Sequence, residues 1–177
     1  MLAESKRLSK IIDDLLDITR LERQQRTYTR VDFDVGGLLR EVADLFSPSF
    51  PNGLRIASAE GIAHADRDAA RRIVSSLVEN AAKYAAASGE VVLSSRAEGS
   101  KIEITVADRG PGLTPAETRH AFERFWRADN SLTRTTSGTG LGLAIAKELA
   151  VGTGGDLSVG PNEGGGSVFT LVLPKGG

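Results

Sequence analysis

The chain has 177 residues, which suits one domain with a short appendage and allows a substantial buried core. Its net charge of −1 gives no global basic field for nucleic acid, and the absence of cysteine excludes disulfides and thiolate metal sites. With two histidines, no His-rich zinc site is expected, and since neither a bilayer-length apolar run nor a signal peptide is evident, we expect a soluble intracellular chain.

Residues 2–25 are predicted to form one amphipathic helix. Its apolar residues recur at the alternating short spacings of a coiled-coil seam. The seam comprises Leu8, Ile11, Leu15 and Ile18, and is widened by Ile12 and Leu16. Two interpretations stay open. The helix packs on its own domain, or, as we favour, it belongs to a bundle or dimer and is followed by a polar linker.

The remaining residues mix strands and helices without strict β-α-β repeats. Strands are predicted at 30–35, 54–58, 62–65, 90–98, 100–108, 156–160 and 166–174. Helices are predicted at 35–48, at 66–86 with Asp66 as the cap, at 115–125 and after the glycines of 138–142. In the first of these helices, the residues expected to point inward are Leu38, Leu39, Val42 and either Leu45 or Phe46. The hairpins indicate an α+β fold with a mixed sheet and helices on one face.

The helix at 66–86 carries the first candidate site. Ser76, Asn80 and Lys83 follow one edge of its apolar stripe. An amide oxygen can ligate Mg²⁺ and a neighbouring amine can neutralise phosphate, so this pair suits a metal–phosphate ligand. The alternative is a surface asparagine and lysine on an amphipathic helix.

The second candidate is the loop that follows the strand at 100–108. Asp108 ends this strand, and Gly110 and Gly112 turn the chain around Pro111. A carboxylate there can accept a hydrogen bond from an exocyclic amine, and glycines let a flat base approach the backbone. The alternative is an ordinary Asp-Gly-Pro-Gly turn.

The third candidate is the aromatic and basic run FERFWR, residues 122–127. Arg127 leads into a polar, breaker-rich segment and could reach a phosphate. The alternative is a helix end that buries Phe122 and Phe125, and both interpretations can hold together.

The fourth candidate is SGTGLGLAIAKEL, from Ser137 to Leu149. It is not a dinucleotide fingerprint, because Leu143 stands where that motif needs glycine, and it lacks the Gly-Lys-Ser/Thr of a Walker loop. It can still direct backbone N–H groups and a helix start toward an anion. The alternative is a flexible hinge with a helix cap.

In this order, the four motifs resemble the catalytic ATP-binding domain of sensor histidine kinases. These domains share a superfamily with gyrase, heat-shock chaperones and MutL, and the resemblance covers residues 31–174. It implies the Bergerat fold: a two-layer α/β sandwich with a mixed, mostly antiparallel sheet of about five to seven strands and about three helices on one face. RLSKIIDDLLDITRLE resembles the end of a dimerisation helix, so residues 1–30 would be the end of the dimerisation and phosphoacceptor domain with its linker, and 31–177 the catalytic domain.

The resemblance also implies a role for each candidate residue. Asn80 would ligate Mg²⁺, with Lys83 on phosphate and Tyr84 beside the nucleotide. Asp108 would accept from the adenine amine, with Gly110 and Gly112 shaping the base pocket, and Arg127 would contact the terminal phosphates. The phosphate loop would comprise Gly138, Thr139, Gly140, Leu141, Gly142 and Leu143. The polar segment 129–139 would be a lid that is mobile without nucleotide.

The implied activity is transfer of the γ-phosphoryl of Mg·ATP to a histidine of the dimerisation domain, in cis or in trans, and from there to a response regulator. The parent would be a homodimeric membrane sensor whose kinase core faces the cytoplasm. Neither His64 nor His120 fits the phosphoacceptor motif, so this chain should bind ATP without phosphorylating itself. Alternatives are an anti-sigma or serine protein kinase of the same fold and a non-catalytic nucleotide-sensing module.

Two positions, Ser76 and Thr153, depart from the family pattern, and the role of a third residue, Glu79, stays open. Ser76 stands where gyrase-type ATPases place a general-base glutamate, which argues against direct activation of water and against a gyrase-like ATPase. Glu79 is adjacent to Asn80 but points about 100° away around the helix, so it is at most a polar helper. Thr153 replaces a usual histidine, outside the expected phosphate site.

Overall fold

The computed structural model describes residues 8–9, 11–16, 18–19, 26–127 and 138–177. Its main sheet has the strand order β2-β4-β5-β7-β6, in which β2 and β4 are parallel and the other pairs are antiparallel. The strands are β2 (Leu54–Ala59), β4 (Val91–Glu98), β5 (Lys101–Ala107), β6 (Asp156–Pro161) and β7 (Ser167–Pro174). The sheet is therefore mixed and mostly antiparallel, as the sequence predicts.

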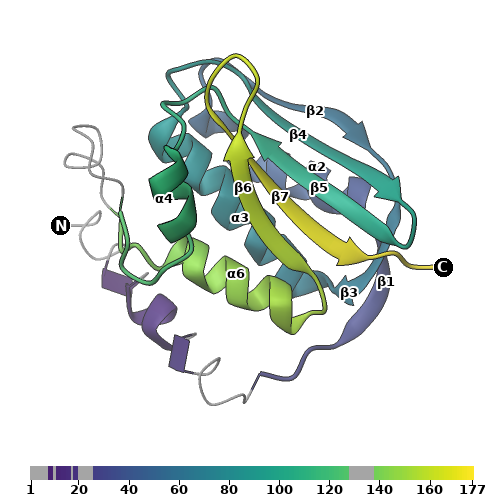
Figure 1. The fold of residues 1–177 in the computed structure, drawn as a ribbon. Helices are drawn as coiled ribbons and strands as arrows, with labels where there is room; N and C mark the ends of the chain where they lie inside the picture. Colours follow the sequence, from purple (N-terminus) through teal and green to yellow (C-terminus); the bar gives the residue numbers. More distant parts are fainter. Residues whose placement is uncertain (1–7, 10, 17, 20–25, 128–137) are drawn as a thin grey trace.

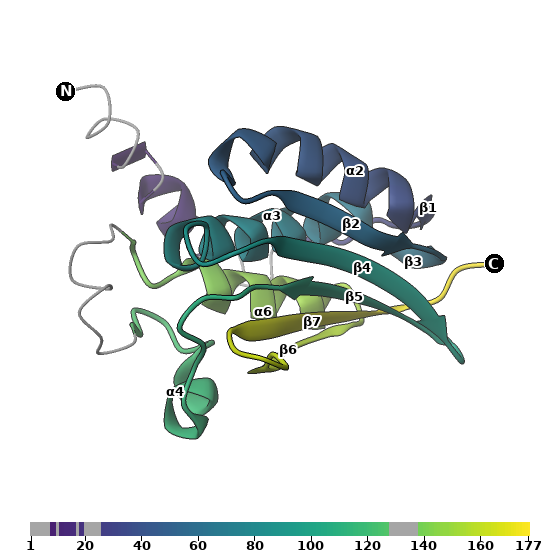
Figure 2. The same ribbon diagram turned by 90° about the horizontal axis from the view of Figure 1, so that it is seen from above.

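A smaller antiparallel ribbon pairs β1 (Arg30–Asp34) with β3 (Ile62–Asp66). The helices α2 (Val35–Phe46), α3 (Arg67–Tyr84) and α6 (Gly142–Gly152) lie together on one face of the main sheet (Figures 1 and 2). The short helix α4 (Pro115–His120) stands apart from this layer, and a 3-10 turn, η1 (Ser47–Ser49), follows α2. The α+β, two-layer prediction is confirmed.

The core lies between the helical layer and the sheet. Alternate residues of β5 and β7 are buried, because strand side chains alternate between the two faces. The fully buried contributors of β5, β7 and the helices include Ile102, Ile104, Leu171, Leu173, Leu38, Leu39, Ile73, Leu77 and Leu149. Of the two candidates near the end of α2, Phe46 packs on the core and Leu45 is 64% exposed.

Helices α2, α3 and α4 begin at polar caps. Asp34 accepts from the backbone N–H groups of α2, and Asp66 accepts from Ala69 N in α3, as predicted. Thr114 and Glu117 form a capping box on α4. Helix α3 ends at Tyr84, two residues earlier than predicted, because Ala85 leaves helical geometry with φ −132°.

The described part of the N-terminal helix is helical, in agreement with the prediction. Only Ile18 of its apolar stripe joins the core, at 7% exposed. The side chains of Leu8, Ile12, Leu15 and Leu16 are 46% to 56% exposed. The helix thus contacts its own domain through one part of the stripe and leaves the rest uncovered by the described residues.

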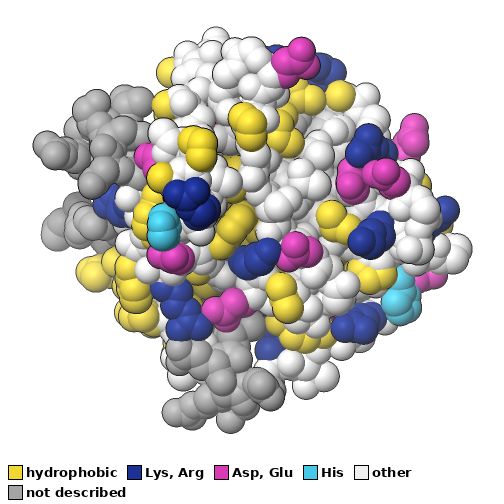
Figure 3. Space-filling view, in the orientation of Figure 1, with side chains coloured by type: hydrophobic (Ala, Val, Ile, Leu, Met, Phe, Trp, Pro, Cys, Tyr) yellow, Lys and Arg dark blue, Asp and Glu magenta, His cyan; other side chains and the backbone are white. Residues whose placement is uncertain are grey.

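The visible face in Figure 3 carries basic and acidic side chains interspersed over the strands and helices. Among the described residues, no helix is both long and apolar enough to span a bilayer. The predicted lid at 129–139 lies outside the described residues except for its last two positions, 138 and 139.

Candidate functional site

The last two turns of α3 carry Asn80, Lys83 and Tyr84. Asn80 is half-buried, and its amide makes no hydrogen bond to the part of the chain that the structure describes. The Lys83 amine lies 3.2 Å from Oε1 of Glu79, one turn earlier. The amide is therefore available to a ligand, while the amine is held by an i,i+4 pair of a kind worth only about 0.3–0.5 kcal/mol.

Asp108 directly follows β5 and is only 6% exposed. Its Oδ1 accepts from Gly110 N at 2.8 Å and from Ser167 N at 3.3 Å. Its backbone N–H donates to Ser167 O at 2.9 Å. Burial raises the pKa of the Asp108 carboxyl above its ordinary value, and the two N–H bonds oppose that rise.

The second carboxylate oxygen of Asp108, Oδ2, has no hydrogen-bond donor among the described residues. Oδ2 is nevertheless accessible to solvent. Among the described residues, the one fully buried side-chain polar atom without a partner is Ser75 Oγ, so the unpartnered Oδ2 is not fully buried. An accessible acceptor in a mostly buried carboxylate suits an incoming N–H donor.

The glycines beside Asp108 allow close approach. A Cβ at Gly110 would lie 2.9 Å from Ala85 Cβ, closer than real Cβ atoms come, and 3.2 Å from Tyr84 O, which is tighter than most Cβ contacts. Gly112 has φ +72°, in the left-handed region that favours glycine. The loop after β5 therefore packs directly on the end of α3.

The glycine loop, residues 138–142, leads into α6 and lies beside α3. A Cβ at Gly142 would lie 3.2 Å from Ser76 Oγ, and one at Gly138 would lie 3.9 Å from the Tyr84 hydroxyl. Leu141 is 1% exposed and Leu143 packs partly on the core, so a ligand could meet these leucines only near their backbone. Thr139 Oγ1 accepts from Leu141 N at 3.2 Å and donates to Asp14 Oδ2 at 3.2 Å.

The aromatic and basic run joins the glycine loop through its backbone. Phe125 N donates to Gly140 O at 2.9 Å, and both residues have positive φ, at 64° and 71°. Phe122 packs on the core, as predicted, but Phe125 is 66% exposed rather than buried. Arg127 is exposed and is the last described residue before the gap at 128–137.

The four candidate motifs are therefore neighbours in space. The end of α3 contacts the Asp108 loop through Gly110 and the glycine loop through Ser76 and Tyr84. The glycine loop in turn contacts the aromatic run at Phe125. Arg127 follows this run in sequence, and these contacts do not place its guanidinium.

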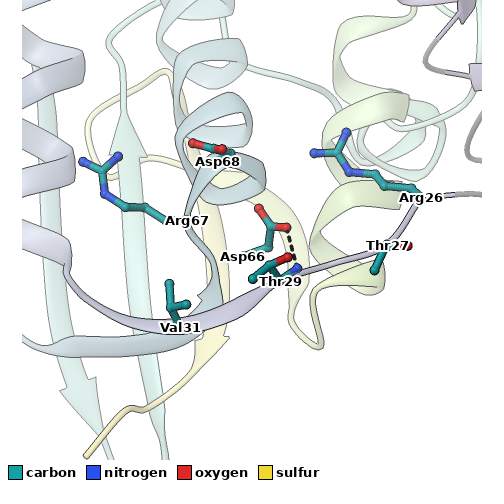
Figure 4. A pocket seen from close by; sticks show the side chains of 7 residues that line it. All are labelled: Arg26, Thr27, Thr29, Val31, Asp66, Arg67 and Asp68. Carbon is teal, nitrogen blue, oxygen red and sulfur yellow. Dashed lines mark hydrogen bonds between the residues drawn. The ribbon is translucent and has the colours of Figure 1, made fainter.

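A separate hollow lies at the opposite end of α3 (Figure 4). It is lined by Arg26, Thr27, Thr29, Val31, Asp66, Arg67 and Asp68. Asp66 Oδ2 accepts from Thr29 N at 3.0 Å, and Asp66 N donates to the buried Thr153 Oγ1 at 2.7 Å. Because a helix rises about 1.5 Å per residue, this hollow is about 20 Å from Asn80. Thr153 thus lies far from the predicted site.

Sequence reasoning did not connect Asp108 with the residues that hold it, which come from the β6–β7 turn and the start of β7. Asn162 Nδ2 donates to Asp108 O at 2.7 Å, and Ser167 pairs with Asp108 through both backbone groups. The available signal was the glycine run at 164–166, because consecutive glycines indicate a turn with positive φ and close backbone contacts.

The mixed sheet, the one-sided helical layer and the site at the end of α3 define the class of the protein: a two-layer α+β domain of the Bergerat fold. Residues 65–177 match the model of the histidine kinase-, DNA gyrase B-, and HSP90-like ATPase family, and the chain belongs to this family. The resemblance expected from the four motifs is confirmed.

Relatives align over nearly the whole chain. Sensor-like histidine kinase SenX3 of Mycolicibacterium smegmatis is 33% identical over 186 residues, covering 99% of this chain and 47% of that protein. Sensor histidine kinase RppB of Synechocystis sp. is 36% identical over 179 residues, covering 97% of this chain and 39% of that protein. The crystal structure of full-length ShkA in complex with AMPPNP superimposes with a TM-score of 0.82 at 34% identity, over 97% of this chain and 37% of that one. The chain spans less than half the length of these relatives.

Proposed function

We propose that this chain is the ATP-binding catalytic core of a two-component sensor histidine kinase. The observation that carries the proposal is the extent of the similarity. Sensor kinases align over 97% to 99% of the chain, including residues before the matched ATPase region at 65–177. An anti-sigma kinase or a gyrase-like ATPase would share the ATPase region alone. Residues 1–30 are then the end of a dimerisation helix with its linker, and 31–177 the catalytic domain.

Adenine recognition falls to Asp108. Its Oδ1 is occupied by the N–H groups of Gly110 and Ser167, while Oδ2 is accessible and has no donor among the described residues. The 6-amino group of adenine would donate to Oδ2, and Gly110 and Gly112 would leave room for the base. The same oxygen would repel a 6-oxo base, which brings an acceptor to an acceptor.

The phosphates would lie between α3 and the start of α6. The first N–H groups of α6 have no acceptor within their own helix and would donate to the phosphates. Gly138 and Gly140 allow the triphosphate to approach the backbone. Lys83 would exchange its weak pair with Glu79 for a charge-assisted bond to phosphate, which is the stronger partner.

A magnesium ion fits the donor set at this end of α3. The described residues contain no group of three or more metal-binding side chains, and the half-buried Asn80 offers one amide oxygen with no internal partner. Mg²⁺ in nucleotide sites commonly takes one or two protein oxygens together with phosphates and water. When bound, the ion would neutralise charge on the triphosphate, with Asn80 as its ligand from this chain.

The phosphoryl acceptor would be a histidine of the dimerisation domain. Both described histidines pair with carboxylates, His64 with Asp32 at 2.6 Å and His120 with Glu123 at 2.8 Å. An imidazole nitrogen would attack the γ-phosphorus as the bond to the ADP oxygen breaks. Lys83 and Arg127 would neutralise the phosphoryl oxygens, so this chain positions the substrate and stabilises its charge.

The partners and location of the parent follow from the same proposal. The phosphohistidine would pass its phosphoryl group to a response regulator, and the parent would act as a homodimer. Its kinase core would face the cytoplasm, with the sensor at the membrane.

Two measurements test the proposal. Titration of the chain with ATP, with and without Mg²⁺, should show binding that Mg²⁺ strengthens. With γ-labelled ATP, the chain alone should incorporate no label, whereas an added dimerisation domain with its histidine should acquire acid-labile label. Binding without transfer to that domain would favour a nucleotide-sensing module, and acid-stable label on serine would favour a serine kinase.

A further inference from the structure

The β6–β7 turn, residues 162–166, and the first residue of β7, Ser167, hold the backbone of Asp108 on two sides. The Asn162 side chain donates to Asp108 O at 2.7 Å, and the Asp108 N–H donates to Ser167 O at 2.9 Å. Ser167 N also reaches Oδ1 at 3.3 Å. Residues 54 to 59 positions away in sequence therefore fix the peptide groups that flank the carboxylate.

The turn fits this loop closely. Asn162 N donates to Gly166 O and Asn162 O accepts from Gly165 N, each at 3.0 Å, which shapes the turn around the asparagine. Any Cβ at Gly166 would overlap with Asp108 O, and one at Gly112 would lie 3.0 Å from Gly166 O. Gly166 has φ +95°. The two segments are thus in backbone contact, and Asn162 is the side chain that bonds across the junction to the Asp108 carbonyl.

We propose that Asn162 is a positioning residue for recognition of the 6-amino group of a purine nucleotide. The proposal rests on the function proposed above, since it assigns the adenine amine to Oδ2 of Asp108. The carbonyl held by Asn162 belongs to the Asp108–Arg109 peptide, which directly precedes the peptide that carries the Gly110 N–H, and that N–H fixes Oδ1. Release of that carbonyl lets the peptide rotate, moves the Gly110 N–H and turns Oδ2 away from the amine.

This role affects only the contact with the 6-amino group of the ligand. It therefore predicts a difference between ATP and inosine triphosphate affinity, which a merely structural role does not. ATP donates its 6-amino group to Oδ2, whereas inosine triphosphate presents a 6-oxo acceptor, which makes no hydrogen bond to that oxygen and is disfavoured by it. Loss of the Asn162 bond should therefore weaken ATP more than inosine triphosphate. Damage to the fold or to the phosphate site would weaken both nucleotides alike.

The test measures affinities of the full chain for Mg·ATP and Mg·inosine triphosphate by titration calorimetry. Asn162→Ala should bind ATP about tenfold more weakly, the scale of one well-placed hydrogen bond, and change inosine triphosphate affinity by less than about twofold. The matched control is Glu163→Ala in the same turn. Glu163 accepts from Arg109 through its carbonyl, and its side chain makes no hydrogen bond or ion pair within the described residues, so both affinities should stay unchanged.

Two further variants keep the test decisive. The isosteric Asn162→Asp preserves the shape of the turn but cannot donate to the carbonyl, and it should lower the ATP to inosine triphosphate affinity ratio at least as much. In an Asp108→Asn background, Asn162→Ala should leave that ratio unchanged, because the oxygen it positions is gone. Equal losses for both nucleotides, or no loss, in a folded variant would overturn the role of Asn162 alone. Failure of the wild-type chain to bind ATP would instead remove the proposed function and this inference with it.

Discussion

Two aspartates, one at each end of α3, look alike by ordinary criteria. Asp66 is 8% exposed and Asp108 is 6% exposed, and each carboxylate accepts two backbone N–H bonds. Each follows or ends a strand, and each backbone N–H donates to a residue distant in sequence, Thr153 or Ser167. Burial and hydrogen-bond count therefore do not separate a structural carboxylate from one that recognises a ligand.

The difference lies in how the two N–H bonds divide between the oxygens. In Asp66, Oδ1 takes Ala69 N and Oδ2 takes Thr29 N, so both oxygens are occupied. In Asp108, Oδ1 takes both donors and Oδ2 has none among the described residues. A carboxylate with one fully satisfied oxygen is held rigidly and still presents an acceptor, which is what a specificity site requires.

Asn80→Ala should have the largest effect, because it removes the proposed metal ligand at the Asp108 end of α3. We expect Mg²⁺-dependent ATP binding to be abolished, while stability changes by less than about 1 kcal/mol because the amide has no hydrogen-bond partner among the described residues. Calorimetric titration with and without Mg²⁺ measures the first effect, and circular dichroism the second.

A matched control for Asn80→Ala is Asn52→Ala, since Asn52 Nδ2 donates to Ala86 O at 3.2 Å just beyond the same helix end. It should keep Mg²⁺-dependent binding. Unfolding of Asn80→Ala would show instead that Asn80 is a core residue.

Asp108→Asn should lower ATP affinity by about 100-fold, the scale of a lost bond plus a clash of two donors. The amide oxygen can keep the bonds from Gly110 and Ser167, which places the NH₂ where Oδ2 faces the ligand. The same NH₂ suits a 6-oxo base, so inosine triphosphate should bind more tightly than ATP. Unchanged preference for ATP in competition titrations would rule out Oδ2 as the recognition atom.

Asp66→Asn makes the same substitution at the other end of α3 and should have the opposite consequence. Both oxygens of Asp66 accept N–H groups, so the amide NH₂ must oppose one of them, and we expect a loss of about 1–2 kcal/mol of stability. ATP affinity should not change, because this site is about 20 Å from Asn80. Urea unfolding and ATP titration on the same sample measure both, and a large loss of affinity without a loss of stability would contradict the comparison.

The strands and helices could be predicted from sequence because their patterns are local. Period-two burial in β5 and β7, the cap at Asp66 and the glycine loop before α6 all lie within short windows. The N-terminal helix shows the limit of such patterns. Periodicity predicts its apolar face, but only contacts reveal that Ile18 is covered and that Leu15 is 46% exposed.

Which oxygen of Asp108 accepts the internal N–H groups, and which is left for a ligand, could not be predicted in this way. The sequence indicates a carboxylate at a strand end and glycines after it, which is enough to propose adenine recognition. Which oxygen is occupied depends on Ser167, 59 positions away, and the carbonyl contact depends on Asn162, 54 positions away. Such pairing follows from the register of β5 against β7, and no local spacing encodes it.

A shift in pH should produce the smallest change in ATP affinity and in stability, and it tests whether Asp108 itself titrates. Burial places the pKa of Asp108 above the ordinary aspartate value of 3.8, and a bound adenine amine would lower it again. ATP must therefore displace a proton, and affinity should fall as pH falls through the raised pKa, with little change near neutrality.

For folding the sign is reversed: a raised native pKa means that the folded chain binds the extra proton, so protonation of Asp108 adds stability as pH falls through the same window. Other carboxyls, such as Asp32 and Asp156, have lowered pKa values and lose stability on acidification, so the readout is the difference between wild type and Asp108→Asn. Acidification should cost wild-type ATP affinity that the variant does not lose, while wild type gains stability relative to the variant. Parallel pH profiles for the two proteins would show that Asp108 does not titrate in this window.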